Sequence, residues 1–154
     1  MILIDGKKAA AELREELKVE VSELKSKYNK VPGLTVILVG EDPASKIYVK
    51  NKEKFAKEVG MNSEALRYPA DLEEKALLNK IDELNKDDKV SGILVQLPLP
   101  KHIDKRKIIE TIDHKKDVDG FHPVMLEIYL QVMIAVFRVH PLGAVYCLKK
   151  LKKI

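Results

Sequence analysis

The sequence predicts an α/β protein with an open, mainly parallel sheet covered by helices on both faces, which is a three-layer arrangement. Two continuous apolar runs, LTVILV at 34–39 and GILVQL at 92–97, have the pattern of strands buried on both faces. Amphipathic segments with helical spacing stand between these and the other strand-like runs. This alternation favours parallel pairing, because parallel neighbours need a long crossover connection.

The composition is typical of one globular domain. The chain has 154 residues, of which 45% are hydrophobic and 34% charged, enough to bury a single core. Its one cysteine, Cys147, excludes an intramolecular disulfide and is typical of a reducing compartment. No apolar segment has the ~20 residues of a membrane span, and the N-terminus lacks a signal sequence. We therefore expect a soluble, cytoplasmic protein without a membrane partner.

The charge of the chain is weakly informative about partners. A formal net charge of +4 admits an anionic ligand, but much of the excess lies in the last six residues, KKLKKI. Nucleic-acid surfaces combine basic patches with stacking aromatic side chains. Because only 5% of the residues are aromatic and none is tryptophan, we expect no nucleic-acid partner.

The remaining elements are predicted from the same patterns. A long first helix has one apolar face, formed by Ala10, Leu13, Leu17, Val21, Leu24 and Tyr28. Further helices are expected over 42–60, 71–85 and 104–112, and further strands over 2–4 and 63–68. The segment HKKDVDGFHP, at 114–123, is expected to be a structured loop.

The helix after the strand 34–39 begins with clear signals. Asp42 is a suitable N-cap, because its carboxylate can accept the unpaired N–H groups of the first turn. Pro43 suits the first helical position, and Gly60 is expected to end the helix. A stripe of apolar residues should face the core, namely Ile47, Phe55 and Val59.

A second stripe on this helix carries polar candidates. Ser45, Tyr48 and Lys52 follow one another at i, i+3 and i+7. An aromatic hydroxyl and an amine therefore lie one turn apart near the carboxyl end of a strand, where open α/β sheets bind ligands. From spacing alone, however, a helical lysine is more often solvated and a tyrosine more often a packing residue.

Polar residues also follow the strand 92–97. Gln96 stands near its carboxyl end, and a buried amide there indicates either a local network or a ligand. Asp117 and Asp119 flank Val118 before Gly120, a pattern that is common in turns. The four histidines lack metal-ligand spacing, and no glycines are close enough for a dinucleotide fingerprint or a Walker loop. We therefore expect no metal.

Three motifs together resemble one family. They are VGEDPASKIYVKNKEK at 39–54, GILVQLPLPKHID at 92–104 and KDVDGFHP at 116–123. In this order they closely resemble the bifunctional methylenetetrahydrofolate dehydrogenase/methenyltetrahydrofolate cyclohydrolase family, and the opening IDGKKAA also fits. The resemblance implies that residues 1–123 form the folate-binding catalytic domain of a two-domain enzyme. In that family a C-terminal Rossmann domain binds NADP.

The resemblance also implies an activity, namely oxidation of 5,10-methylenetetrahydrofolate with NADP and hydrolysis of 5,10-methenyltetrahydrofolate to 10-formyltetrahydrofolate. Lys52 would be the catalytic lysine, a proton shuttle whose amine needs partial desolvation to release its proton near neutral pH. Tyr48 would stack on the folate, and Gln96 would hydrogen-bond both the lysine and the substrate. Asp119 would accept hydrogen bonds from the pterin N–H groups. Ser45 would be a supporting residue of the substrate-binding surface.

The segment after Val124 departs from the family. There the family continues with an N-x-G turn and later a P-C-T-P segment, whereas this chain reads MLEIYLQVMIAVFRVHP at 125–141, before the match returns with PLGAVYCLKKL. With suitable synonymous codons, a shifted reading frame turns the window into NVGNIFTGNDSCFPCTP, which restores both motifs. The pattern suggests one base lost near Val124 and one regained near Pro141.

We interpret residues 124–154 as a divergent tail or the start of an interdomain linker. The sequence ends about where the family's Rossmann domain would begin, so we expect this chain to bind no NADP and to lack dehydrogenase activity. Weak cyclohydrolase activity at most is expected. The alternatives are a truncated non-catalytic remnant or folate-binding module, and an unrelated flavodoxin-like interaction domain. Whether the apolar window packs on the sheet as a helix or supports a homodimer stays open.

Overall fold

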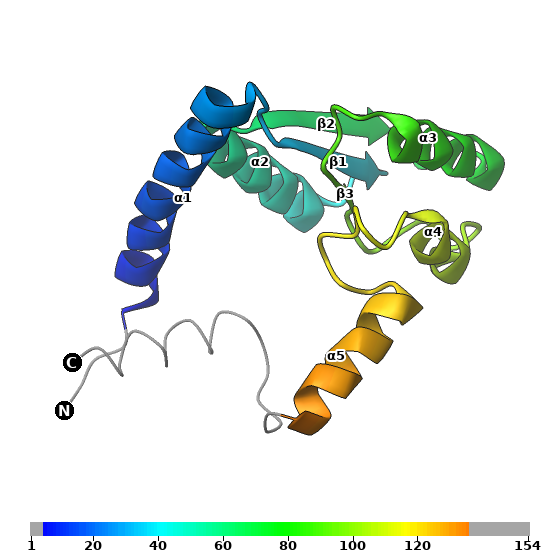
Figure 1. Ribbon diagram of the computed structural model, residues 1–154. Helices are drawn as coiled ribbons and strands as arrows, with labels where there is room; N and C mark the ends of the chain where they lie inside the picture. Colours follow the sequence, from blue (N-terminus) through cyan, green and yellow to red (C-terminus); the bar gives the residue numbers. More distant parts are fainter. Residues whose placement is uncertain (1–4, 136–154) are drawn as a thin grey trace.

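The computed structural model describes residues 5–135 as three parallel strands with helices on both faces of the sheet (Figure 1). The strands are β1 (Gly33–Val39), β2 (Asn62–Tyr68) and β3 (Gly92–Val95), in the sheet order β2-β1-β3. The helices are α1 (Gly6–Tyr28), α2 (Pro43–Glu58), α3 (Glu74–Lys86), α4 (Lys105–Thr111) and α5 (Pro123–Ala135). The predicted α/β class is confirmed. The strand expected at 2–4 lies outside the described residues.

The central strand β1 sets the register of the sheet. It pairs in parallel with β2 along its whole length and with β3 over four residues. The ladder continues one step beyond β3, because the Gln96 N–H donates to the Ile37 carbonyl at 2.8 Å. All three strands therefore end at the same edge of the sheet, and Gln96 follows β3 directly at that edge.

Each face of the sheet has its own core. On one face, Ile37, Val39, Ile93 and Val95 pack with apolar residues of α3 and α4, such as Leu77, Ile81 and Ile108. On the other face, Val36, Leu38 and Leu94 pack with Val49 of α2. Because β1 sends alternate side chains to opposite faces, and both faces are covered, its run of apolar residues needs no polar alternation.

The predicted apolar stripe of α2 is wrong at two of its three residues. Val59 is buried, but Ile47 and Phe55 are 62% and 39% exposed. The helix buries Ser45, Val49 and Ala56 instead, which recur at about the 3.6-residue helical period. Ile47 lies two positions from both Ser45 and Val49, and so it falls on the opposite side of the helix.

The first helix packs against α2 and the turn that follows it. Val21 is its one buried residue, and it lies against the turn at Gly60, where a Cβ atom in place of the glycine hydrogen would meet a Val21 methyl group at 3.5 Å. Other members of the predicted face, Leu24 and Tyr28, remain 40% and 66% exposed. The α1 face is therefore buried only around its middle.

Pro123–Ala135 form α5, in the region where the sequence lacks the family's motifs. This helix extends away from the sheet (Figure 1). Several of its apolar side chains are exposed, among them Leu126 and Ile128. No helix within residues 5–135 is long and apolar enough to cross a membrane.

Candidate active site

Lys52 and Gln96 meet across the carboxyl edge of the sheet, although 44 positions separate them in the sequence. Lys52 comes from α2, and its Nζ donates to Gln96 Oε1 at 3.2 Å. The other end of the Gln96 amide, Nε2, donates to the Leu97 carbonyl at 2.8 Å. This second hydrogen bond fixes the orientation of the amide, so that its oxygen faces the lysine.

Asp119 joins this pair from the loop that follows α4. Although the residue as a whole is exposed, desolvation of its carboxyl group raises its pKa above the usual aspartate value. The nearby charge of Lys52 opposes this shift, and the charge of Asp117 adds to it. An amine, an amide and a carboxylate therefore converge at the edge where parallel sheets bind ligands.

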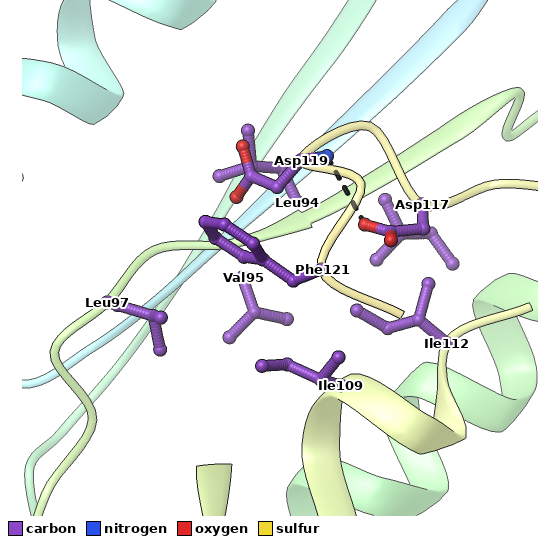
Figure 2. A pocket seen from close by; sticks show the side chains of 9 residues that line it. Leu94, Val95, Leu97, Ile109, Ile112, Asp117, Asp119 and Phe121 are labelled. Carbon is purple, nitrogen blue, oxygen red and sulfur yellow. Dashed lines mark hydrogen bonds between the residues drawn. The ribbon is translucent and has the colours of Figure 1, made fainter. Parts of the chain in front are cut away.

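The loop that carries Asp119 is held by a second carboxylate. Asp117 Oδ1 accepts the Asp119 N–H at 3.2 Å, the bond that Figure 2 draws as a dashed line. Its Oδ2 accepts the His122 N–H at 2.8 Å. The sequence pattern predicted a turn here, but not that the Asp117 side chain would bind two backbone N–H groups of the loop. The signal was the Asp-x-Asp-Gly spacing, which favours side-chain to backbone hydrogen bonds.

Tyr48 stands on α2 one turn before Lys52, as the spacing predicts. Its side chain is 60% exposed, so an aromatic surface is open to a planar ligand beside the lysine. The structure thus places Tyr48, Lys52, Gln96 and Asp119 around one edge. Their predicted roles toward a ligand stay predictions.

Ser45 has a different environment from its neighbours on the polar stripe. It is 2% exposed, and its N–H donates to Asp42 Oδ2 at 2.8 Å. That N–H, followed by the Ser45 hydroxyl, holds the pKa of Asp42 below its usual value. Ser45 therefore stabilises the start of α2, and the geometry favours a supporting role over direct contact with a ligand.

Two hollows lie at opposite edges of the sheet. A cavity of about 10 Å³ lies under the loop, lined by Leu97, Asp119 and Phe121 among others (Figure 2), and has room for about one water. A groove of about 510 Å³ lies at the opposite, amino-terminal edge, where its lining includes Asn62 and Lys89.

The starts of α1 to α4 do not fit the phosphates of NADP. A dinucleotide needs a helix N-terminus with free N–H groups, whose partial positive charge attracts the pyrophosphate. In this structure the side chains of Asp5, Asp42 and Asp104 accept hydrogen bonds at the starts of α1, α2 and α4. The first turn of α3 carries Glu74. Acidic side chains occupy these ends and would repel a phosphate.

No metal site is apparent in the part of the chain that the structure describes. Within residues 5–135, no group of three His, Cys, Asp or Glu side chains is arranged to hold a metal ion. His140 and Cys147 lie outside the described residues.

The three motifs around this edge belong to a known domain. Residues 4–119 match the family model described as "Tetrahydrofolate dehydrogenase/cyclohydrolase, catalytic domain". The chain belongs to this family. The tetrahydrofolate dehydrogenase/cyclohydrolase resemblance of the sequence motifs is thereby confirmed, and the alternative of an unrelated flavodoxin-like domain is wrong.

Relatives within the tetrahydrofolate dehydrogenase/cyclohydrolase family are longer than this chain. "Bifunctional protein FolD" of Pelagibacter ubique is 70% identical over 124 residues, which are 80% of this chain and 44% of that protein. The crystal structure of the bifunctional enzyme FolD from Campylobacter jejuni is similar with a TM-score of 0.90 at 45% identity, over 99% of this chain and 54% of that one. The chain spans about half the length of these relatives.

A further solved relative bears on the cofactor. The FolD of Trypanosoma brucei, described as complexed with NADP cofactor and inhibitor, is similar with a TM-score of 0.78 at 36% identity. The similarity covers 80% of this chain and 42% of that chain. NADP is thus a ligand of a family member, and that protein extends well beyond the part matched here.

Proposed function

We propose that this chain binds a reduced folate at the carboxyl edge of its sheet and hydrolyses 5,10-methenyltetrahydrofolate to 10-formyltetrahydrofolate. The observation that carries the proposal is the hydrogen bond of 3.2 Å between Lys52 Nζ and Gln96 Oε1, with Asp119 close enough for the lysine charge to act on it. The family model and the names of the relatives support it, since they describe a dehydrogenase and cyclohydrolase of folate.

The hydrolysis involves two proton movements, and Lys52 performs the second in this proposal. In the substrate a single carbon joins N5 and N10 as a cationic amidine, and water adds to that carbon and loses a proton to the solvent. The bond from the carbon to N5 then breaks, N5 takes up the hydroxyl proton, and the carbon remains on N10 as a formyl group. In this proposal the Lys52 amine takes the proton from the hydroxyl and delivers it to N5. Gln96 holds the amine at the reacting carbon through its amide oxygen.

Tyr48 and Asp119 bind and orient the substrate in this proposal. The exposed ring of Tyr48 provides a stacking surface one helical turn from the amine. Asp119 accepts hydrogen bonds from the amino and ring N–H groups of the pterin, which an ionised carboxylate can do with both oxygens. Together they fix the plane and the in-plane rotation of the pterin ring, and so they place its bridge carbon near Lys52.

NADP accepts a hydride from the methylene bridge when it is bound in the family's dehydrogenase reaction. The starts of α1, α2 and α4 do not fit its phosphates, because aspartate side chains cap them. We therefore derive no hydride step from this chain. For the 154-residue polypeptide assayed alone we expect no reduction of NADP with 5,10-methylenetetrahydrofolate, since hydride transfer needs both reactants held together.

We also propose a division of the chain at residue 123. Residues 1–123 form the folate-binding catalytic domain, and residues 124–154 are a divergent tail or linker toward the Rossmann domain that the sequence resemblance implies for this family. The family-model match ends at 119, before the window that lacks the family's motifs.

Sequencing the gene across 124–141 tests the proposed frame shift. A gene whose alternative frame encodes neither N-x-G nor P-C-T-P would refute it.

The cyclohydrolase proposal is tested by following the absorbance of 5,10-methenyltetrahydrofolate after protein is added. We expect the protein to accelerate its loss, and Lys52→Ala to abolish the acceleration. Lys50→Ala is the matched control, because Lys50 is an exposed lysine on the same helix and lies two positions away, on another side of it. Equal rates for Lys52→Ala and the parent protein would refute the catalytic role of Lys52.

A second candidate function is a folate-binding module that does no chemistry. The openness of the site favours it, because Tyr48 is 60% exposed and catalytic proton transfers benefit from the exclusion of water. Calorimetric binding of tetrahydrofolate together with an unchanged absorbance of 5,10-methenyltetrahydrofolate would select this function over hydrolysis.

A further inference from the structure

We propose that Asp117 is a positioning residue of the folate site, whose carboxylate holds the loop 117–122 in the turn that presents Asp119 beside Lys52. The inference rests on the proposed function, since it concerns the same site. Asp117 itself would not touch the folate.

The hydrogen bonds of Asp117 span the tip of the loop. Oδ1 accepts the N–H of Asp119 at 3.2 Å, and Oδ2 accepts the N–H of His122 at 2.8 Å. Between these two anchor points stands Gly120 with φ of +69°, a left-handed conformation that favours glycine. One carboxylate therefore ties together the two sides of a sharp turn, and Asp119 lies within that turn.

The start of the loop is fixed by the sheet. The Ile93 N–H donates to the Lys116 carbonyl at 2.7 Å, and Asp117 forms an isolated parallel bridge with Ile93. The Lys116 amine donates to the carbonyls of Leu84 and Asp87, at 3.1 and 2.8 Å. Asp117 thus stands on a rigid base formed by β3 and the end of α3, and its side chain extends this support to the loop tip.

The two aspartates of the motif have different hydrogen-bonding states. Both oxygens of Asp117 accept backbone N–H groups, which leaves little capacity for a ligand. Among the described residues, by contrast, no donor is bonded to the Asp119 carboxylate, which interacts through charge with Lys52 and Asp117. This difference assigns ligand contact to Asp119 and support to Asp117.

A positioning role has a measurable consequence for affinity. If the loop samples other conformations when its anchor is removed, the apparent affinity falls in proportion to the population of the competent one. Should that population drop to about a tenth, the binding of a folate weakens about tenfold. The rate of the bound complex changes less, because Lys52 and Gln96 are untouched, so we expect a larger effect on KM than on kcat.

The variants Asp117→Ala and Asp117→Asn test this inference against Asp5→Ala. Alanine removes both acceptors, whereas asparagine keeps one oxygen and places an amide nitrogen at the other. Asp5 is the matched control, because it also accepts two backbone N–H groups, at 3.0 and 3.1 Å, but at the start of α1. Melting temperatures identify a variant that fails to fold, in which case Asp117→Asn is used alone.

Two readouts are compared in these proteins. We expect the amide hydrogens of Asp119 and His122 to exchange at least about tenfold faster in Asp117→Ala than in the parent or in Asp5→Ala. We expect tetrahydrofolate, titrated calorimetrically, to bind about tenfold more weakly to Asp117→Ala, with Asp117→Asn intermediate.

The outcomes separate this inference from the proposed function. Unchanged exchange in Asp117→Ala overturns the positioning role, whatever the affinity. Faster exchange with unchanged affinity for tetrahydrofolate also overturns it. A parent protein that shows no binding of tetrahydrofolate overturns the proposed function, and the inference with it.

Discussion

The two edges of the sheet differ in their hollows and in the polar side chains that they bring together. The amino-terminal edge has a groove of about 510 Å³, whose lining includes the polar residues Asn62 and Lys89. At the carboxyl edge a cavity of about 10 Å³ lies beneath the loop that carries Asp119, and Lys52, Gln96 and Asp119 converge at that edge. Convergence of polar groups, rather than volume, therefore distinguishes the candidate site.

After Lys52→Ala, the largest effect on hydrolysis at the carboxyl edge is expected for Gln96→Leu. Leucine fills a similar volume but leaves the Lys52 amine without its oxygen partner. The amine becomes charged when it takes the proton from the hydroxyl, and losing a hydrogen bond to a charged group costs about 1.5–3 kcal/mol, so hydrolysis of 5,10-methenyltetrahydrofolate should slow roughly 10- to 100-fold. The steady-state rate measures this effect.

Asn62→Ala is the control for Gln96→Leu at the amino-terminal edge. Asn62 is a polar residue that lines the larger groove, and its removal should leave the hydrolysis rate unchanged. Equal losses in the two variants would show that the edges do not differ in function.

A smaller effect is expected in the pH dependence of stability. Desolvation raises the pKa of Asp119, so the folded protein holds this proton more tightly than the unfolded chain does. The charged form therefore disfavours folding at neutral pH. Asp119→Asn should raise the melting temperature at pH 7, and the difference should vanish at a pH below the usual aspartate pKa.

Replacing Glu53 should change the melting temperature in the opposite direction, and so Glu53 serves as the control for Asp119. Hydrogen bonds from Lys57 and then Arg67 hold the pKa of Glu53 below its usual value, so its contribution to stability is present at neutral pH. That contribution is lost as the pH falls through the lowered pKa. Glu53→Gln should lower the melting temperature at pH 7, and a shift of the same sign in both variants would contradict the assignment for Asp119.

The smallest effect is expected for Ser63→Ala at the amino-terminal edge. Ser63 Oγ is buried without a hydrogen-bond partner among the described residues, and the residue lines the groove there. Removing an unpaired buried hydroxyl should leave the free energy of unfolding within about 0.5 kcal/mol of the parent or raise it. Chemical denaturation measures it, and a loss of tetrahydrofolate affinity in this variant would show that ligand binding extends to this edge.

The sheet and its carboxyl edge were predictable because their signals are local. The run LTVILV forms β1, and Asp42 caps α2 as its chemistry suggests. The convergence of Lys52 and Gln96 followed from a resemblance, because no local pattern relates two residues 44 positions apart. The structure adds the hydrogen bond itself, from Lys52 Nζ to Gln96 Oε1.

Other features depend on tertiary packing and were missed. The face of α2 that meets the sheet is the one with Val49, which packs with strand residues, and Ile47, although apolar, lies on another side and stays exposed. A hydrophobic pattern ranks side chains by polarity, whereas a helix that approaches a sheet closely favours small ones. The anchoring by Asp117 was missed because a turn signal indicates a bend but not what the bend presents.

The hydrogen bond between Lys52 and Gln96 links the activity of the site to the pairing of β3 with β1. Its donor belongs to α2 and its acceptor follows β3, which pairs with β1. If β3 leaves β1, the acceptor leaves with it, even while α2 remains helical. Hydrolysis measured during mild denaturation should therefore fail together with the pairing of β1 and β3, and not gradually with the loss of helix.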